Sequence, residues 1–219
     1  MIILKKFSIL LISILLAASF SGCEKKNTGS SGNSKPETPA VTEDVSDDDT
    51  SHEDGYINEK RKNTDYESLK NEALALLKEY YGGLEKKNYD QFIGVFPDFY
   101  QKAFEDETKN KYNQTNDECI TGMYDEFEIT YGEDFYIVPE IIESGILQLD
   151  DKSLKELNKM VAETFDVDGV KVTDAYSINF QQITRGSKNR DSMPLEFLMI
   201  KTDNKFYLYD NYYTDKKGV

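Results

Sequence analysis

Carboxylates and phenols are the side chains of this sequence that could transfer protons, since the chain contains 41 acidic residues and 15 tyrosines but one histidine. That histidine, His52, lies among acidic and small polar residues, a setting typical of an exposed linker. An Asp–His pair is therefore excluded for the folded part of the chain. A tyrosine beside a carboxylate whose pKa is raised in an apolar pocket stays chemically possible. The spacing singles out no such pair, so we assign no catalytic residue.

Motifs for phosphate, metal and nucleophile chemistry are missing from the sequence. It contains no glycine-rich phosphate loop, nucleophile elbow or zinc-protease motif. The stretch Asp166–Gly169 begins like a calcium-binding loop, but its glycine comes too early and the twelfth position is Ser177 instead of glutamate. We interpret this stretch as a turn and expect neither a metal nor a cofactor.

The N-terminal cysteine lies at the end of an apolar segment. Residues 7–18 carry no charge and are apolar except for two serines. Lys5 and Lys6 precede them, and Cys23 follows. A membrane-spanning helix needs roughly 20 apolar residues, so this run is too short to be a permanent span. A charged start, a short apolar run and small residues before a cysteine indicate that residues 1–22 are a signal peptide.

The residues Ser21, Gly22 and Cys23 resemble the lipobox of bacterial lipoproteins, with Phe20 in place of the usual leucine. The resemblance implies that the Cys23 thiol is lipidated and that the bond before it is cleaved. Two or more acyl chains would anchor the protein stably to the extracytoplasmic face of the cell membrane.

The second cysteine, Cys119, then has no partner for an internal disulfide. Ile120 and Met123 lie near it on an apparent helix, which favours a small buried apolar side chain. A reactive or intermolecularly paired thiol is the alternative interpretation.

Composition divides the mature chain into two parts. Residues 23–64 lack apolar periodicity, and Thr42–Asp54 contains seven carboxylates, which predicts a disordered acidic tether. Residues 65–215 have the length of a single domain. The formal net charge of −15 would repel phosphate backbones, so nucleic acid is not expected as a partner.

The first half of this domain has helical spacing. The pattern predicts a helix from Asp65 to Tyr81 that ends at Gly82–Gly83, and a short helix from Asn88 that ends before Pro97. Pro97 can open the next helix. A fourth apolar stripe follows over residues 119–127.

The second half is dominated by strands. Residues 135–149 predict one long bent strand or two short ones, 150–165 a helix capped by Asp151 or Ser153, and 172–183 a strand. The runs 195–201 and 206–212 predict a hairpin about 202–205.

This hairpin is apolar on both faces if Lys201 pairs with Phe206, so both faces need a cover. A ligand cavity, a partner subunit or the helix at 150–165 could cover the second face. We expect a pocket or interface on the face that carries Tyr176, Ile178, Phe180, Phe197, Met199, Phe206 and Leu208.

Helices that open with "LKNEALALLKEYYGGLEKKNYDQFIGVFP", followed by strands that close with "DNKFYLYDNYY", resemble the nuclear transport factor two-like or cystatin-like domains of bacterial surface lipoproteins. The resemblance implies an α+β cone in which N-terminal helices pack on a curved antiparallel sheet, and the helix near 150–165 departs from it. Members of this family include enzymes and non-enzymes, so fold alone does not decide function.

We therefore expect a membrane-tethered, non-catalytic domain that binds a small hydrophobic ligand or an envelope protein. A small lyase or isomerase that uses tyrosine with aspartate or glutamate is one alternative. A structural or regulatory partner domain is another.

Overall fold

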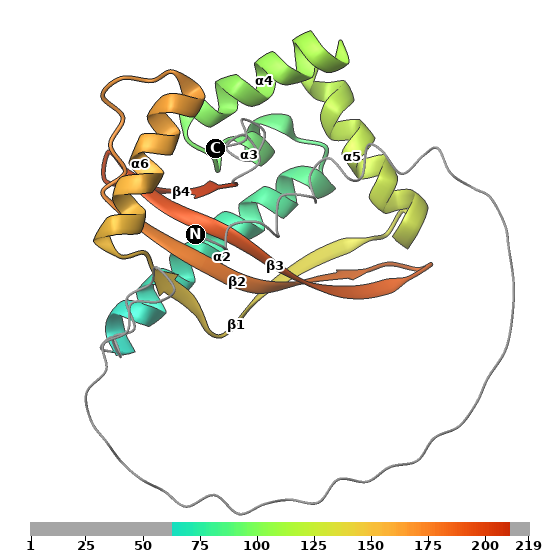
Figure 1. Cartoon of the computed structure of the whole chain (residues 1–219). Helices are drawn as coiled ribbons and strands as arrows, with labels where there is room; N and C mark the ends of the chain where they lie inside the picture. Colours follow the sequence, from blue (N-terminus) through green and yellow to red (C-terminus); the bar gives the residue numbers. More distant parts are fainter. Residues whose placement is uncertain (1–62, 211–219) are drawn as a thin grey trace, which may run out of the picture.

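The computed structural model of the chain describes residues 63–210, which form an α+β fold (Figure 1). The predicted signal peptide, Cys23, residues 24–62 and residues 211–219 lie outside the described residues. Four helices come first and a four-stranded antiparallel sheet follows, with one helix inserted after its first strand. In chain order the elements are α2 (Asn63–Glu85), α3 (Tyr89–Ile93), α4 (Asp98–Tyr112), α5 (Asn116–Tyr131), β1 (Tyr136–Gln148), α6 (Asp151–Phe165), β2 (Asp174–Arg185), β3 (Arg190–Thr202) and β4 (Lys205–Tyr209).

The sheet is an antiparallel meander with the order β1-β2-β3-β4. The predicted hairpin is confirmed with its register, since Lys201 pairs with Phe206 and Met199 pairs with Leu208. Its two turn residues, Asp203 and Asn204, have φ values of 50° and 61°. Two consecutive left-handed residues are typical of the turn whose twist matches a β-hairpin.

Strand β1 is one long strand, the first of the two possibilities that the sequence left open. Its pairing with β2 shifts between Ile141 and Ile146, where Ser144 has a φ of 56°. The irregularity lets β1 bend. Beyond it, the side chains of β1 again alternate between the two faces of the sheet.

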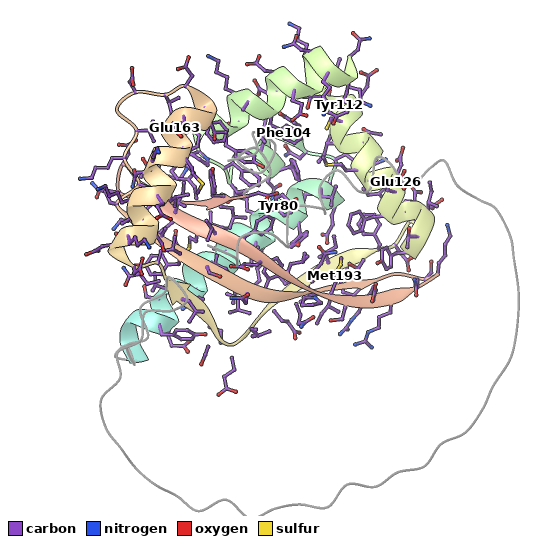
Figure 2. The ribbon with its side chains drawn as sticks, in the orientation of Figure 1. Tyr80, Phe104, Tyr112, Glu126, Glu163 and Met193 are labelled. Carbon is purple, nitrogen blue, oxygen red and sulfur yellow. The ribbon has the colours of Figure 1, made fainter. Side chains whose placement is uncertain are left out.

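Helix α2 packs on one face of the sheet, and we call it the covered face. The Tyr80 ring lies 5.6 Å from the Phe197 ring, and the Tyr81 ring lies 6.5 Å from the Phe180 ring. Figure 2 shows Tyr80 in the layer between the helices and the strands. Edge-to-face ring pairs add to the apolar area that this layer buries. The buried strand residues of this face include Ile137, Ile146, Tyr176, Ile178, Phe180, Phe197, Met199 and Leu208.

Helix α6 covers one end of the opposite face. Ala175, Ile200 and Tyr209 point to that face and are buried, and the Phe165 ring of α6 lies 6.4 Å from the Tyr209 ring. Asn158 holds the helix to the backbone of Val172, donating to its carbonyl (2.9 Å) and accepting from its N–H (2.8 Å). The helix predicted near 150–165 is therefore confirmed, and it covers this end of the second face. Its cap is Asp150, which accepts from the Ser153 N–H at 2.7 Å, so the predicted caps Asp151 and Ser153 were wrong; they lie one and three residues beyond the cap.

The predicted end of the first helix at Gly82–Gly83 was also wrong, because α2 continues to Glu85. A Cβ atom on Gly83 would clash with the backbone nitrogen of Phe92. Glycine is therefore present because α3 passes close to α2 at this point, and not because the helix stops.

Replacing Gly83 with alanine should destabilise the fold by about 1–3 kcal/mol, because the new methyl group has to displace the α3 backbone. The matched control is Gly122→Ala in α5, where a Cβ would meet nothing within 4 Å. That control should be neutral or stabilising by up to about 1 kcal/mol, the usual gain from Gly to Ala in a helix. Urea unfolding of both variants measures the difference, and equal effects would contradict the close approach.

Candidate functional site

The seven residues predicted to line a pocket lie together on the covered face. Six of them are buried and Phe206 is partly buried, packed against the core. The Phe180 and Phe197 rings stack with their centroids 5.8 Å apart, and the Tyr176 ring lies 6.0 Å from the Phe206 ring. The structure brings these residues together as predicted, with α2 packed on the face that they form. A ligand at this face stays a prediction from the sequence.

A chain of buried polar groups also lies on the covered face. The Tyr81 hydroxyl donates to Gln182 Oε1 at 2.8 Å, and Gln182 Nε2 donates to Thr184 Oγ1 at 3.3 Å. Burial raises the pKa of Tyr81 well above its usual value, so the phenol stays protonated and serves as a donor. The partners in this chain are an amide and a hydroxyl, which satisfy buried polar atoms and fix side chains in place.

A polar hollow of about 550 Å³ opens between the α2–α3 turn and the start of α5. Its polar groups are largely occupied by local structure. Thr115 and Glu118 form a capping box on α5, and Lys87 contacts Asp125 (3.4 Å) and the Tyr124 ring (4.0 Å to its centroid). The residues around the hollow are Lys87, Asn88, Tyr89, Asp90, Thr115, Asn116 and Asp117.

The part of the second face that α6 leaves uncovered is the surface most suited to binding. We call it the open face, and it consists of nine residues on three neighbouring strands. In Figure 1 no helix lies below the right-hand part of these strands, where the β2–β3 hairpin extends past α6. The nine residues are Tyr136, Val138, Glu140, Gln181, Ile183, Arg185, Arg190, Ser192 and Pro194.

One exposed apolar side chain belongs to the open face, and two others lie further along β1. Tyr136 is 45% exposed and belongs to it, while Leu147, 36% exposed, lies on the same face of β1. Ile142, in the irregular part of β1, is 43% exposed. Val138 and Ile183 are half-buried and pair with each other between them. Together with these two residues, Tyr136 gives the open face an apolar part on β1 and β2.

Two arginines lie at one end of the open face. Arg185 pairs with Arg190 across the hairpin and with Tyr136 on β1. Like charges directly opposite each other are destabilising. Among the described residues neither guanidinium has an ion pair, and the buried Arg185 Nε atom has no hydrogen-bond partner. Arginine and tyrosine are enriched where proteins bind each other.

The outer edge of β1 is closed to strand addition at the same end. The Glu85 carboxylate accepts a hydrogen bond from the Ile137 N–H at 2.5 Å, and Pro139 has no N–H to donate. Burial raises the pKa of Glu85, against the opposing effect of this hydrogen bond. A partner would therefore meet the face of the sheet and not its edge.

Replacing Glu85 with glutamine keeps an acceptor for Ile137 and removes the charge that burial disfavours. Because the raised pKa makes the folded state hold the proton more tightly, wild-type stability should fall as the pH rises above the ordinary value of 4.5. The glutamine variant should lack this part of the pH dependence. Glu85→Ala leaves the N–H without its acceptor and should cost about 1–3 kcal/mol. Thermal unfolding of the three proteins from pH 4 to 8 tests this, and identical pH profiles would contradict the assignment.

The prediction for Cys119 is confirmed, whereas the arginine pair was not predicted. Cys119 is buried as predicted, and burial raises the pKa of its thiol, which disfavours the reactive thiolate. Arg185 and Arg190 were not singled out from the sequence. The signal was available, because these are the only two arginines after residue 61.

Comparison of the chain with protein-family models, with curated proteins and with solved structures found no match. Within residues 63–210, no helix is long and apolar enough to cross a membrane. The same part of the chain contains no group of three or more histidine, cysteine, aspartate or glutamate side chains placed to hold a metal.

Proposed function

We propose that this chain is a bacterial lipoprotein, anchored through Cys23 on the extracytoplasmic face of the membrane, whose domain binds an envelope protein and is not an enzyme. The observation that carries the binding function is the open face. It is the part of the sheet that α6 leaves uncovered, and it combines the exposed Tyr136 and two half-buried apolar side chains with two arginines that have no ion pair among residues 63–210.

A protein partner is better supported than a small ligand. The apolar face that the sequence analysis favoured for a ligand is packed against α2. The polar hollow beside α5 is lined by charged and amide side chains, whereas pockets for small hydrophobic molecules are mostly apolar. An open sheet face suits the broad contact that proteins make with each other.

The likeness to cystatin-like domains is part of this proposal. It is supported by the helices that precede an antiparallel meander and pack on one of its faces. The insertion of α6 between β1 and β2 departs from the simplest version of that fold.

Replacing Cys23 with serine should release the protein from membranes or leave it unprocessed, because lipidation requires the thiol. Fractionation of cells that express wild type or Cys23→Ser, with mass spectrometry of the N-terminus, measures both effects. A membrane-bound wild-type protein with an unmodified N-terminus at a residue other than Cys23 would contradict the anchoring proposal.

A photo-crosslinking residue at Val138, in the middle of the open face, should give a discrete cross-linked product in whole cells. The control is the same residue at Lys155, an exposed position on α6. The control should give no such product, since α6 presents no open sheet surface. Equal products at both positions, or none at Val138, would contradict binding through the open face.

A further inference from the structure

We infer that the partner at the open face is a protein that presents an acidic side chain to Arg185 and Arg190, next to an apolar side chain that packs on Val138 and Ile183. The inference rests on the proposed function, because it names the chemistry of the partner at the same face. One row of the face is thereby assigned to a carboxylate and the next row to an apolar group.

The register places both arginines in one row of the open face. Arg185 of β2 lies directly opposite Arg190 of β3, and Tyr136 of β1 completes the row. Side chains directly opposite each other have Cβ atoms about 5 Å apart, so both guanidinium groups can reach the same carboxylate. Like charges in this position are destabilising, and an anion bound between them would offset that cost.

The described part of the chain provides no anion for this row. Neither arginine has an ion pair among residues 63–210. Acidic residues that neighbour the row along the chain are used elsewhere. Asp191 accepts from the Ser192 N–H at 2.7 Å, and Asp134 accepts from the Ser187 N–H at 2.8 Å. An acidic group from another molecule would complete the row.

Glu140 does not prevent an acidic group from binding at the arginine row. It lies four residues after Tyr136 on β1, which is about 13 Å along the strand. Exposed charges separated by more than the Debye length, about 8 Å at physiological ionic strength, are largely screened from each other. Repulsion between Glu140 and a carboxylate on the arginines is therefore small.

The row next to the arginines favours a protein segment over a free anion. Val138 and Ile183 pair with each other about 7 Å from the arginine row, and both are half-buried. Alternate residues of an extended segment, or residues one turn apart on a helix, lie about 5 to 7 Å apart. A segment with one acidic and one apolar side chain at this spacing would contact both rows, whereas a free anion would leave the apolar row in water.

A partner protein also fits better than an anionic lipid surface. A lipid surface would face the whole domain, and the formal net charge of −15 on the chain would oppose that approach. Segments that bind anionic lipids carry about four to eight basic residues, and this row has two arginines. A single acidic side chain on a partner protein needs only the arginine row.

The test uses the full chain in whole cells, with the photo-crosslinking residue at Val138. Arg185→Gln with Arg190→Gln should lower the cross-linked product by about tenfold or more, the loss expected when charge-assisted hydrogen bonds are removed. The matched control is Lys152→Gln with Lys155→Gln, which removes the same charge from exposed positions on α6. The control should give as much product as the parent chain.

Mapping of the product by mass spectrometry identifies the acidic group. The partner should carry an aspartate or glutamate within about four residues of its cross-linked position, because this length of chain covers the distance between the two rows. Replacing that acid with lysine should remove the product from the parent chain. The product should return with Arg185→Glu and Arg190→Glu, and this recovery also shows that the arginine variants fold.

Three results would overturn the inference: a product that Arg185→Gln with Arg190→Gln leaves unchanged, an equal loss in the lysine control, or a mapped partner without an acidic residue near the cross-link. A product with a phospholipid, with a second copy of this chain or with the chain's own acidic residues 42–54 would also overturn it. Failure of the proposed function looks different. A product that does not depend on the arginines keeps the open face as a binding site and rejects the acidic partner, whereas no product at Val138 in the parent chain rejects both.

Discussion

The structure depends on one constraint, which is that β2 and β3 present apolar side chains to both faces of the sheet while α2 can cover only one of them. On the first face, Phe180 and Phe197 meet the tyrosines of α2. On the second face, Ala175 and Ile200 need a different cover, and α6 supplies it. Helix α6 lies over one end of the strands only, where its Phe165 ring lies 6.4 Å from the Tyr209 ring (Figure 1). The hairpin therefore extends past its cover, and the open face is the consequence.

The open face differs in character from the core next to it. Where α6 covers the second face the inward residues are apolar and buried, whereas beyond it they become mixed, with Arg185, Gln181 and Glu140 among them. Lys188 fastens the tip of the hairpin to the end of α5 by donating to the carbonyls of Glu128 (3.3 Å) and Ile129 (3.5 Å). The side chains of the open face therefore lie on strands that are fixed at both ends. This favours a binding surface that is preorganised.

Local patterns predicted the elements well, and they failed where a distant contact decides the residue. The register of the last hairpin followed from alternation and from a four-residue turn, because both act within a few residues. Gly83 was misread as a helix end because its reason is the backbone of Phe92, which the periodicity of α2 does not reveal. The sequence also showed that both faces of the hairpin are apolar. It could not show which face lies under α2, since that depends on the packing of a helix about 100 residues away along the chain. The pocket residues were therefore grouped correctly as one face, while Arg185 and Arg190 were overlooked.

The central claim is that the open face is covered by a partner in the working protein. Hydroxyl-radical footprinting of native membranes, read by mass spectrometry at Tyr136, tests it most directly. Tyr136 is 45% exposed and Tyr112, on α4 away from the open face, is half-buried and serves as the internal reference. The account predicts that Tyr136 is oxidised less than Tyr112 in membranes and more than Tyr112 after dilution of the detergent-solubilised protein. Oxidation of Tyr136 that exceeds that of Tyr112 in both preparations would show that the face is bare and would contradict the account.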